Sequence, residues 1–404
     1  MERLKKFKKA LSFLPAVPIF ILLRILEPFF LCRFLSVNIG RIGGIRELDW
    51  YLSARKLFKL NKKTIDIFYL IASSERICNH TWKKLWKRTG SLAPLSWLWY
   101  RVDYLNKKFS PNKKTNSIPM LNVAKLLKTK DEKQMLWEIL RNKKPWISFT
   151  SKEEKIGKKK LEQMGIALDK EFICFHARDK AYLDKIHPSR DWSYHDYRNS
   201  NIQNYFLAMQ WMSQQGYYAI RTGAIVSDKL NLTYPKIIDY ATNGMRNEFM
   251  DIYLGAKCWF YLCSDVGISM IPEMFRRPLV YVNWTPISRL STFVHHALFI
   301  PKKFFSKDKQ KYLTFREIIE SGIGSLLSGE TLQQRNIELI ENTPEEILSV
   351  VEEMTGRLNG TWIESQEEKS LQEKFWAIYG NRILKTLDFR IGAVYLRENQ
   401  NLLL

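Results

Sequence analysis

The sequence contains few cysteines and no recognisable metal-binding motif. Its five cysteines are an odd number, and Cys174, Cys258 and Cys263 lie in apolar runs where a thiol packs as a small hydrophobic side chain. There is no Cys-x-x-Cys pair and no His-Glu-x-x-His motif, and the six histidines have no spacing typical of metal ligands. A disulfide framework is therefore not expected, and neither is a metal ion or another bound cofactor.

Two nucleotide-binding motifs are also missing. No Walker-type lysine loop occurs, and no Gly-x-Gly-x-x-Gly turn follows an expected strand, because Gly322 and Gly324 follow a helical pattern and Leu327 replaces the third glycine. These absences argue against P-loop ATPases and dinucleotide-binding dehydrogenases.

Acidic residues are scarce relative to basic ones. Lys and Arg total 64 against 41 Asp and Glu, which gives a formal charge of +23 and a pI of about 9.6. Such a surplus indicates an anionic partner, and lipid headgroups, nucleotides, nucleic acids and acidic polysaccharides all fit it. The basic residues are spread along the chain and no RNA or DNA motif is present, so we expect no nucleic acid and keep that class as an alternative.

Long hydrophobic runs are absent, but the N-terminus is amphipathic. Residues 11–23 are almost wholly apolar, and the ten residues before them carry five Lys or Arg and one Glu. The run stops at Arg24, short of the roughly 20 residues needed to cross a bilayer, and no signal-peptide cleavage site follows. We predict that residues 1–36 associate with an anionic membrane surface. A buried helix with a basic lead-in is the alternative.

Apolar strand-like runs alternate with helical patterns along the rest of the chain, and this predicts an α/β fold with parallel sheets. Strand, glycine-rich turn and helix follow one another from Val37, and a second strand is expected at residues 64–73. The expected domains are an N-terminal one at residues 37–165, a ligand-binding one at residues 166–335, and a C-terminal helical segment at residues 336–404. In the last, Thr343-Pro344-Glu345-Glu346 predicts a capped helix.

Two polar motifs follow apolar strands in the second domain. His176 and Arg178 fall on one face at the end of a strand, a position that suits a diphosphate. A surface ion pair of Arg178 with Asp179, together with a His176 ring satisfied by backbone, explains the motif equally well. The turn from Ser264 to Gly267 precedes an expected helix, where backbone amides attract an anion. A plain helix cap is the alternative there.

A third candidate is the loop at residues 191–199. It packs aromatic, ionisable and amide side chains together without hydrophobic periodicity, so it reads either as a substrate-facing loop or as a loop tied by its own hydrogen bonds. In the first case His195 or Asp196 acts as a general base, with Asp265 as a further candidate.

Several segments resemble a bacterial family of glycosyltransferases found with surface-polysaccharide genes. The resemblance covers approximately residues 24–300 and is most specific over residues 172–286. It rests on RIGGIRE and ICNHTWKKLWKR, and on FICFHARD, DWSYHDYRNSNIQNY, GYYAIRTG, PKIIDYA and FMDIYLGAKCWFYLCSDVGISMIPEMFRRPLVYVNWTP. The implied fold is GT-B, in which two Rossmann-like domains face each other across a central cleft.

A looser resemblance is to inverting fucosyltransferases of that fold, whose strand-end His-x-Arg binds the donor diphosphate. It implies that Arg178 neutralises the leaving diphosphate and that His176 orients the diphosphate or its sugar. That motif often has a second arginine before the aspartate, whereas Asp179 follows Arg178 directly here. The expected donor-binding residues are His176, Arg178, Arg221, Ser264, Gly267 and Ser269.

The glycine-rich turn supplies the acceptor-side candidates Arg41, Gly43 and Gly44, although Gly44 stands where the related motif usually has a histidine. A tight turn between strand and helix explains these glycines equally well.

Taken together, the residues and the resemblance predict a metal-independent hexosyl- or deoxyhexosyltransferase. No Asp-x-Asp motif occurs, which argues against a donor held through a divalent ion. The expected partners are a nucleoside diphosphate sugar, a cell-surface polysaccharide or lipid-linked glycan, and the cytoplasmic face of a bacterial membrane. The alternatives are a basic nucleic-acid-binding protein and a non-catalytic scaffold of the same fold.

Overall fold

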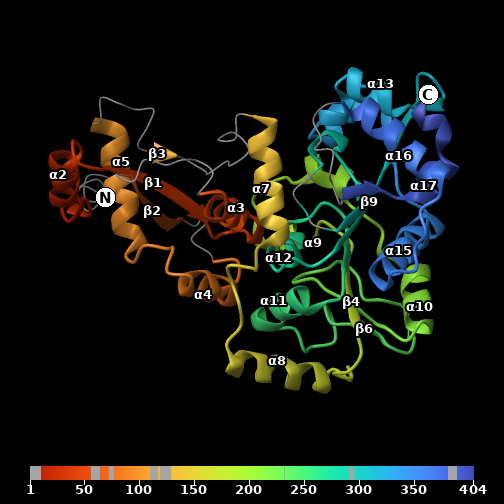
Figure 1. The fold of residues 1–404 in the computed structure, drawn as a ribbon, viewed down its shortest axis with the longest axis horizontal. Coiled ribbons are helices and arrows are strands. Elements are labelled where there is room, and N and C mark those ends of the chain that lie inside the picture. The colour runs from red at the N-terminus through yellow and green to blue at the C-terminus, as the bar shows by residue number, and fades with distance from the viewer. Residues whose placement is uncertain are drawn as a thin grey trace. The chain divides into compact units, whose positions relative to one another are not determined.

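The computed structural model describes residues 11–55, 64–71, 77–109, 117–118, 129–231, 233–290, 294, 296–380 and 389–404. The chain divides into two compact units, Met1–Ser148 and Phe149–Leu404, and each is described by itself (Figure 1). Residues 1–10, which carry the basic part of the predicted membrane-associating segment, lie outside the described residues.

A three-stranded parallel sheet forms the middle of the first unit. Its order is β2-β1-β3, with β1 at Leu31–Asn38, β2 at Thr64–Ile71 and β3 at Ser117–Ile118. β1 and β2 consist mainly of apolar residues, and they pair over all eight residues of each strand. The strand predicted at residues 64–73 is confirmed over residues 64–71, and residues 72–73 lie outside the described residues.

The predicted membrane-associating segment, residues 1–36, is not one structural element. Part of it is the helix α2 (Ala16–Leu26), as expected, but β1 begins at Leu31 and runs through the centre of the sheet. Phe34 and Leu35 are buried there. The apolar character of the end of this segment therefore reflects the core of a sheet, and extending the lipid-facing segment to residue 36 was wrong.

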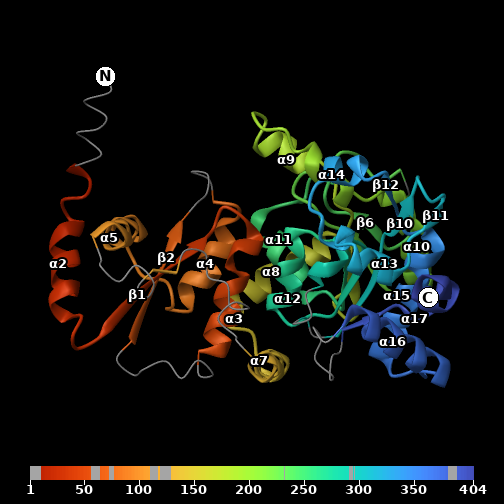
Figure 2. The same ribbon diagram turned by 90° about the horizontal axis from the view of Figure 1, so that it is seen from above.

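Helices pack around this sheet. They are α2, α3 (Arg46–Ala54), α4 (His80–Arg88), α5 (Ser96–Phe109) and α7 (Lys130–Asn142). α2 packs against α5 and crosses it, so that Figure 2 shows α2 lengthwise and α5 nearly end-on. The buried side chains of Ala16 and Val102 lie in their shared core. No described helix is long and apolar enough to cross a membrane.

A seven-stranded parallel sheet organises the second unit, in the order β13-β9-β8-β7-β4-β5-β6. From the β6 edge, the strands follow the chain in the order 3-2-1-4-5-6-7, which is that of a doubly wound sheet. The α/β prediction is confirmed. The strands are β4 (Phe172–His176), β5 (Tyr218–Arg221), β6 (Ile237–Asp239), β7 (Tyr261–Cys263), β8 (Leu279–Trp284), β9 (Ala297–Pro301) and β13 (Phe389–Ile391).

A small antiparallel sheet and further helices complete the second unit. The sheet has the order β11-β10-β12, with strands β10 (Lys303–Ser306), β11 (Lys311–Tyr312) and β12 (Ile337–Ile340). The helices are α8 (Ser151–Gln163), α9 (Ala181–Ile186), α10 (Phe206–Gln214), α11 (Glu248–Lys257), α12 (Met270–Met274), α13 (Phe315–Glu320), α14 (Gly329–Gln334), α15 (Pro344–Asn359), α16 (Gln366–Tyr379) and α17 (Ala393–Glu398). The predicted capping box at Thr343 opens α15.

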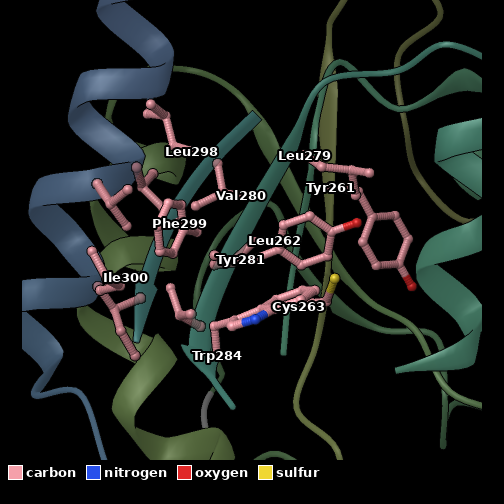
Figure 3. Packing of buried hydrophobic residues seen from close by; sticks show 14 of the residues in the cluster. Tyr261, Leu262, Cys263, Leu279, Val280, Tyr281, Trp284, Leu298, Phe299 and Ile300 are labelled. Atoms are coloured by element: carbon pink, nitrogen blue, oxygen red, sulfur yellow. The ribbon is translucent and has the colours of Figure 1, made fainter. Parts of the chain in front are cut away.

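The hydrophobic core lies along the central strands of the seven-stranded sheet. Nearly every residue of these strands is apolar, as parallel strands covered on both faces require. Figure 3 shows side chains of β7, β8 and β9 packed together, among them Leu262, Cys263, Tyr281 and Phe299. The cysteines of this core are buried free thiols, as the sequence predicts.

The boundary between the two units lies after Ser148, earlier in the sequence than the predicted boundary after residue 165. α8 packs on α11 within the second unit, because Gly157 lets the Tyr253 ring approach and a Cβ there would lie 2.2 Å from it. Lys257 of α11 also pairs with Glu154 of α8 at 2.6 Å. The predicted C-terminal segment contains helices, but it also contributes β13 to the large sheet and so belongs to the same unit.

Candidate functional site

The carboxyl ends of β4 and β7 lie side by side at the centre of the seven-stranded sheet. His176 of β4 and Cys263 of β7 are partners in the parallel register. The strand order reverses between these strands, since β5 and β6 follow β4 on one side while β8 and β9 follow β7 on the other. In doubly wound sheets, ligands bind in the crevice at this switch point. The predicted donor-binding segments, residues 176–178 and 264–269, follow these two strands directly.

The ring of His176 is fixed by the neighbouring strand end. Its Nδ1 lies 2.8 Å from the carbonyl oxygen of Thr222, and since a carbonyl only accepts, Nδ1 carries the proton and Nε2 holds a lone pair. Gly223 follows Thr222 at a position that needs glycine, because a Cβ there would lie 2.6 Å from Val226, although its 3.5 Å distance from the His176 ring would be an ordinary contact. Burial lowers the pKa of His176, so the ring is neutral at pH 7. The neutral ring can accept a hydrogen bond from a hydroxyl group, but it carries no positive charge to attract a phosphate.

Arg178 is a buried cation with neutral hydrogen-bond acceptors. Only 7% of the residue is exposed. Its Nη1 donates to the carbonyl oxygen of His195 at 3.2 Å and to the side-chain oxygen of Asn199. Burial, followed by the nearby charge of Arg198, lowers the pKa of Arg178. A guanidinium in this setting favours an anionic ligand, because burying a charge is costly until an opposite charge compensates it.

The alternative of an ion pair between Arg178 and Asp179 does not match the contacts. The carboxylate of Asp179 accepts hydrogen bonds from the backbone amides of Ala181 and Ser227, each at 2.9 Å. Asp179 therefore ties together the loops that follow β4 and β5.

The loop at residues 191–199 contains the 3-10 turn η2 (Ser193–Arg198) and lies beside Arg178. The His195 ring stacks on Trp192 with the centroids 6.1 Å apart. Asp196 is exposed, and its carboxylate accepts a hydrogen bond from the Asn199 side-chain amide at 2.8 Å. Asn199 thus joins the carboxylate of one base candidate to the guanidinium of Arg178.

A second link connects this loop to the turn after β7. The guanidinium of Arg198 donates to the backbone carbonyl of Asp265 at 2.6 Å and lies 3.0 Å from its carboxylate. The link holds both sides of the switch point together. It also engages the carboxylate of Asp265, which makes this residue less suited than Asp196 to accept a proton.

The turn after β7 differs from the predicted helix N-terminus. The 3-10 turn η4 (Gly267–Ser269) precedes α12, which has only five residues, so little helix dipole is available. Ser264 is fully buried and its hydroxyl has no hydrogen-bond partner among the described residues. The Ser269 hydroxyl donates to the turn's own backbone at 2.7 Å. A Cβ on Gly267 would meet no atom within 4 Å, so there is open space beside it.

The structure gives Arg221 a different setting from Arg178. It is buried at the end of β5, donates to the carbonyl oxygen of Asp228 at 2.6 Å, and pairs with Asp239 of β6 at 3.4 Å. These contacts lie on the β5–β6 side of the sheet rather than at the switch between β4 and β7. Arg221 therefore holds two loops of the fold, and its charge also acts on the nearby His176. Its role in donor binding stays a prediction.

The acceptor-side candidates belong to the first unit, in a turn that follows β1. The 3-10 turn η1 (Ile42–Ile45) contains Gly43 and Gly44, and Arg41 before it is exposed. A Cβ on Gly44 would lie 2.3 Å from the carbonyl oxygen of Asn38. The tight turn itself therefore requires glycine at position 44.

The sequence prediction missed three residues of the site. Asn199 and Arg198 lie in the loop that was singled out, but only their contacts identify them. Lys302, just after β9, is buried and donates from Nζ to the carbonyl oxygen of Asn199 at 2.6 Å. Burial lowers the pKa of Lys302, and no local pattern could have found it, because it is 103 residues from Asn199.

Within the described part of the chain, no group of three or more His, Cys, Asp or Glu side chains is placed to hold a metal ion.

No protein-family model and no curated protein sequence matches the chain. Several solved glycosyltransferase structures are similar to it in fold. A glycosyl transferase family 9 protein from Veillonella parvula is 10% identical with a TM-score of 0.46, and the match covers 80% of this chain and 96% of that one. The ADP-heptose lps heptosyltransferase II of E. coli is 13% identical with a TM-score of 0.38, covering 81% and 98%. An α-1,6-fucosyltransferase soaked with GDP-fucose is 10% identical with a TM-score of 0.28, covering 62% and 95%.

Proposed function

We propose that this chain is a GT-B glycosyltransferase that takes its sugar from a nucleoside diphosphate without using a metal ion. One observation carries the proposal, namely the buried guanidinium of Arg178 at the switch point of a doubly wound sheet. The switch point is where such sheets bind nucleotides, and a guanidinium donates two parallel hydrogen bonds to phosphate oxygens. The hydrogen-bond partners of Arg178 are neutral, so the diphosphate would add bonded negative charge to that of the nearby Asp196 and Asp265 carboxylates.

In the proposed reaction, a hydroxyl oxygen of the acceptor attacks the anomeric carbon of the donor sugar. The bond from that carbon to the phosphate oxygen breaks, and its electron pair leaves with the nucleoside diphosphate. Arg178 stabilises the charge that develops on this leaving group. The hydroxyl proton passes to a carboxylate, for which the exposed Asp196 is better suited than the paired Asp265.

His176 has a separate role in this proposal. Because its ring is neutral and Nδ1 is used by the Thr222 carbonyl, Nε2 accepts a hydrogen bond from a hydroxyl of the donor. His176 therefore orients the sugar or the ribose, while Arg178 binds the charge.

We propose that the transferred sugar is a hexose or deoxyhexose and that the acceptor is a cell-surface polysaccharide or a lipid-linked glycan. The resemblance in sequence supports this choice. The formal charge of +23 supports a place at the anionic cytoplasmic face of a membrane, where a lipid-linked acceptor is found.

The test is thermal-shift measurement of the full chain with a panel of nucleoside diphosphates and their sugars in the presence of EDTA. We expect a saturable stabilisation by one nucleotide, lost in Arg178→Ala. Arg190→Ala is the matched control, because Arg190 is an exposed arginine after the same strand. A donor that stabilises the chain should then be turned over with an oligosaccharide acceptor.

Three results would contradict the proposal or part of it. If no nucleotide shifts the unfolding temperature, the proposed donor site is wrong. Salt-sensitive binding to heparin and DNA instead of nucleotides would favour the nucleic-acid alternative. A nucleotide shift that needs a divalent ion would contradict metal independence alone. Binding without turnover of any acceptor would favour the non-catalytic scaffold.

A further inference from the structure

The outer side of α2 is an apolar stripe that the described residues of its unit leave exposed. The inner side packs through Ala16, which is fully buried, with Ile19 and Leu23 beside it. The opposite side presents large hydrophobic side chains at helical spacing, and between 38 and 67% of each is exposed. On α2 itself they are Val17, Ile21, Leu22 and Ile25, and Leu14 and Phe29 continue the stripe in the turns just before and after the helix.

α5 extends this stripe with aromatic side chains. Trp97, Tyr100 and Tyr104 lie on one side of α5 at spacings of three and four residues, and about half of each is exposed (49, 50 and 46%). Phe13 joins the two helices, because its ring centroid lies 5.2 Å from that of Tyr104. The guanidinium of Arg101 lies over the rings of both Phe13 and Trp97, at 5.7 and 5.2 Å.

We call the outward side chains of α2 and α5, which Phe13 connects, the α2–α5 face. Exposed apolar surface of this extent on a single unit indicates an interaction site rather than chance.

The charges around the α2–α5 face are mainly positive. α5 carries Arg101, Lys107 and Lys108, and its Asp103 is buried beneath Lys107, which bonds to it at 2.6 Å. The ten residues that lead directly into this part of the chain carry five Lys or Arg and one Glu. A second copy docked face to face would bring these like charges together. An anionic surface attracts them.

We propose that the α2–α5 face docks on the surface of an anionic lipid bilayer. The outer stripe of α2 enters the boundary with the acyl chains, Trp97, Tyr100 and Tyr104 lie at headgroup level, and the basic residues contact lipid phosphates. α2 lies in the plane of the surface and does not cross it, because eleven residues of helix span about 16 Å, roughly half the hydrocarbon thickness.

This surface differs from the segment that the sequence suggested. It includes α5, which carries no long apolar run, and it excludes β1, which belongs to the sheet. It uses no residue of the proposed donor site, so its test is independent of glycosyl transfer.

The experiment is flotation of the full chain with vesicles of phosphatidylcholine alone or mixed with phosphatidylglycerol. We expect the wild type to float with the anionic vesicles, less so in high salt. The double variant Leu22→Glu/Ile25→Glu should bind at least about tenfold more weakly, because it places two charges in the apolar boundary. Ile363→Glu is the matched control, since Ile363 is 90% exposed on the second unit and should bind as the wild type does.

A second variant tests the electrostatic part of the proposal. Replacing Lys5, Lys6, Lys8 and Lys9 with Gln should also weaken binding to anionic vesicles about tenfold or more, while leaving the weak affinity for neutral vesicles unchanged. Unfolding temperatures equal to that of the wild type would show that these surface changes leave the fold intact.

The proposal is wrong if no vesicle floats the chain, or if the Leu22→Glu/Ile25→Glu variant binds as tightly as the wild type. A concentration-dependent dimer in solution that this variant dissociates would overturn it in favour of an interface between two copies. Loss of vesicle binding by the Leu22→Glu/Ile25→Glu variant, with nucleotide binding unchanged, would support the proposal.

Discussion

The ammonium group of Lys302 donates a hydrogen bond to the backbone carbonyl of Asn199 over 2.6 Å, and so connects the end of β9 to the loop after β4. Asn199 in turn accepts a hydrogen bond from Arg178 through its side chain. Lys302 is 5% exposed and also lies 3.6 Å from the Glu341 carboxylate. A lysine buried in this way is costly unless its bonds are made, so it fixes Asn199 and through it the guanidinium that we propose binds the diphosphate.

We predict that Lys302→Met lowers the affinity for the donor nucleotide about tenfold, because a hydrogen bond to a charged group is worth about 1.5–3 kcal/mol and its loss frees the Asn199 loop. Isothermal titration with the nucleoside diphosphate measures this. Lys307→Met is the control, since Lys307 forms an exposed pair with Glu338 and should bind normally. If Lys302→Met binds the nucleotide with unchanged affinity, Lys302 does not contribute to the donor site.

The two aspartates near Arg178 should respond differently to the loss of their charge. We predict that Asp196→Asn lowers kcat about a hundredfold or more without changing nucleotide affinity, since the amide no longer accepts the hydroxyl proton. Asp265→Asn should keep most of its turnover, because its carboxylate pairs with Arg198 at 3.0 Å. Steady-state rates and nucleotide titrations of both variants decide this. A larger loss of kcat in Asp265→Asn would reverse the assignment.

The neutral ring of His176 predicts a specific loss of stability in acid. Burial lowers its pKa in the folded chain, whereas in the unfolded chain the pKa is about 6.5. As the pH falls through that value, the unfolded chain takes up a proton that the folded chain does not, so the free energy of unfolding decreases. The decrease amounts to about 1.4 kcal/mol for each unit by which the pKa is lowered.

Urea unfolding measured near pH 7 and near pH 5 checks this. The wild type should lose more stability between the two values than His176→Gln, whose side chain does not titrate. The other ionisable groups are common to both chains, so their contributions cancel in the comparison. Equal losses would mean that His176 is protonated in the folded chain as easily as in the unfolded one.

The sequence predicts the large sheet well because its strands are local signals. β4, β7 and β8 are apolar runs that end in polar residues, and a parallel strand covered on both faces has that pattern. β1 was misjudged for the same reason, since LCRFL reads equally as a strand or as the end of an interfacial segment. β13 has three residues and no apolar run of its own, and only pairing with β9 makes it a strand.

The sequence likewise predicts some residues of the candidate site and misses others. Its strand-end residues, such as Arg178, follow from the alternation of strands and helices. The partners that hold them do not, because the contacts of Arg178 with Asn199 and of Lys302 with Asn199 span 21 and 103 residues. The Arg198 contact with Asp265 spans 67 residues. Pairings over such distances depend on where the loops cross, which no local pattern records.

Substitutions at two glycines should have different effects, because Gly44 is needed for the fold and Gly267 is proposed to lie beside the bound phosphate. A Cβ on Gly44 would lie 2.3 Å from the carbonyl oxygen of Asn38, and backbone cannot move aside cheaply. We therefore predict that Gly44→Ala destabilises the first unit, by about 1–3 kcal/mol or more as for other overpacked sites. Thermal unfolding measures this effect, and a melting temperature equal to that of the wild type would contradict it.

Gly267 should behave in the opposite way. No atom lies within 4 Å of a Cβ built there, so Gly267→Ala should fold with the stability of the wild type. If the diphosphate occupies the open space beside the turn after β7, the added methyl group should lower nucleotide affinity about tenfold, because it prevents the close approach of a phosphate to the backbone. Thermal unfolding without nucleotide, followed by titration with nucleotide, measures both effects on one variant. Normal affinity would move the phosphate away from Gly267 and leave Arg178 as its main contact.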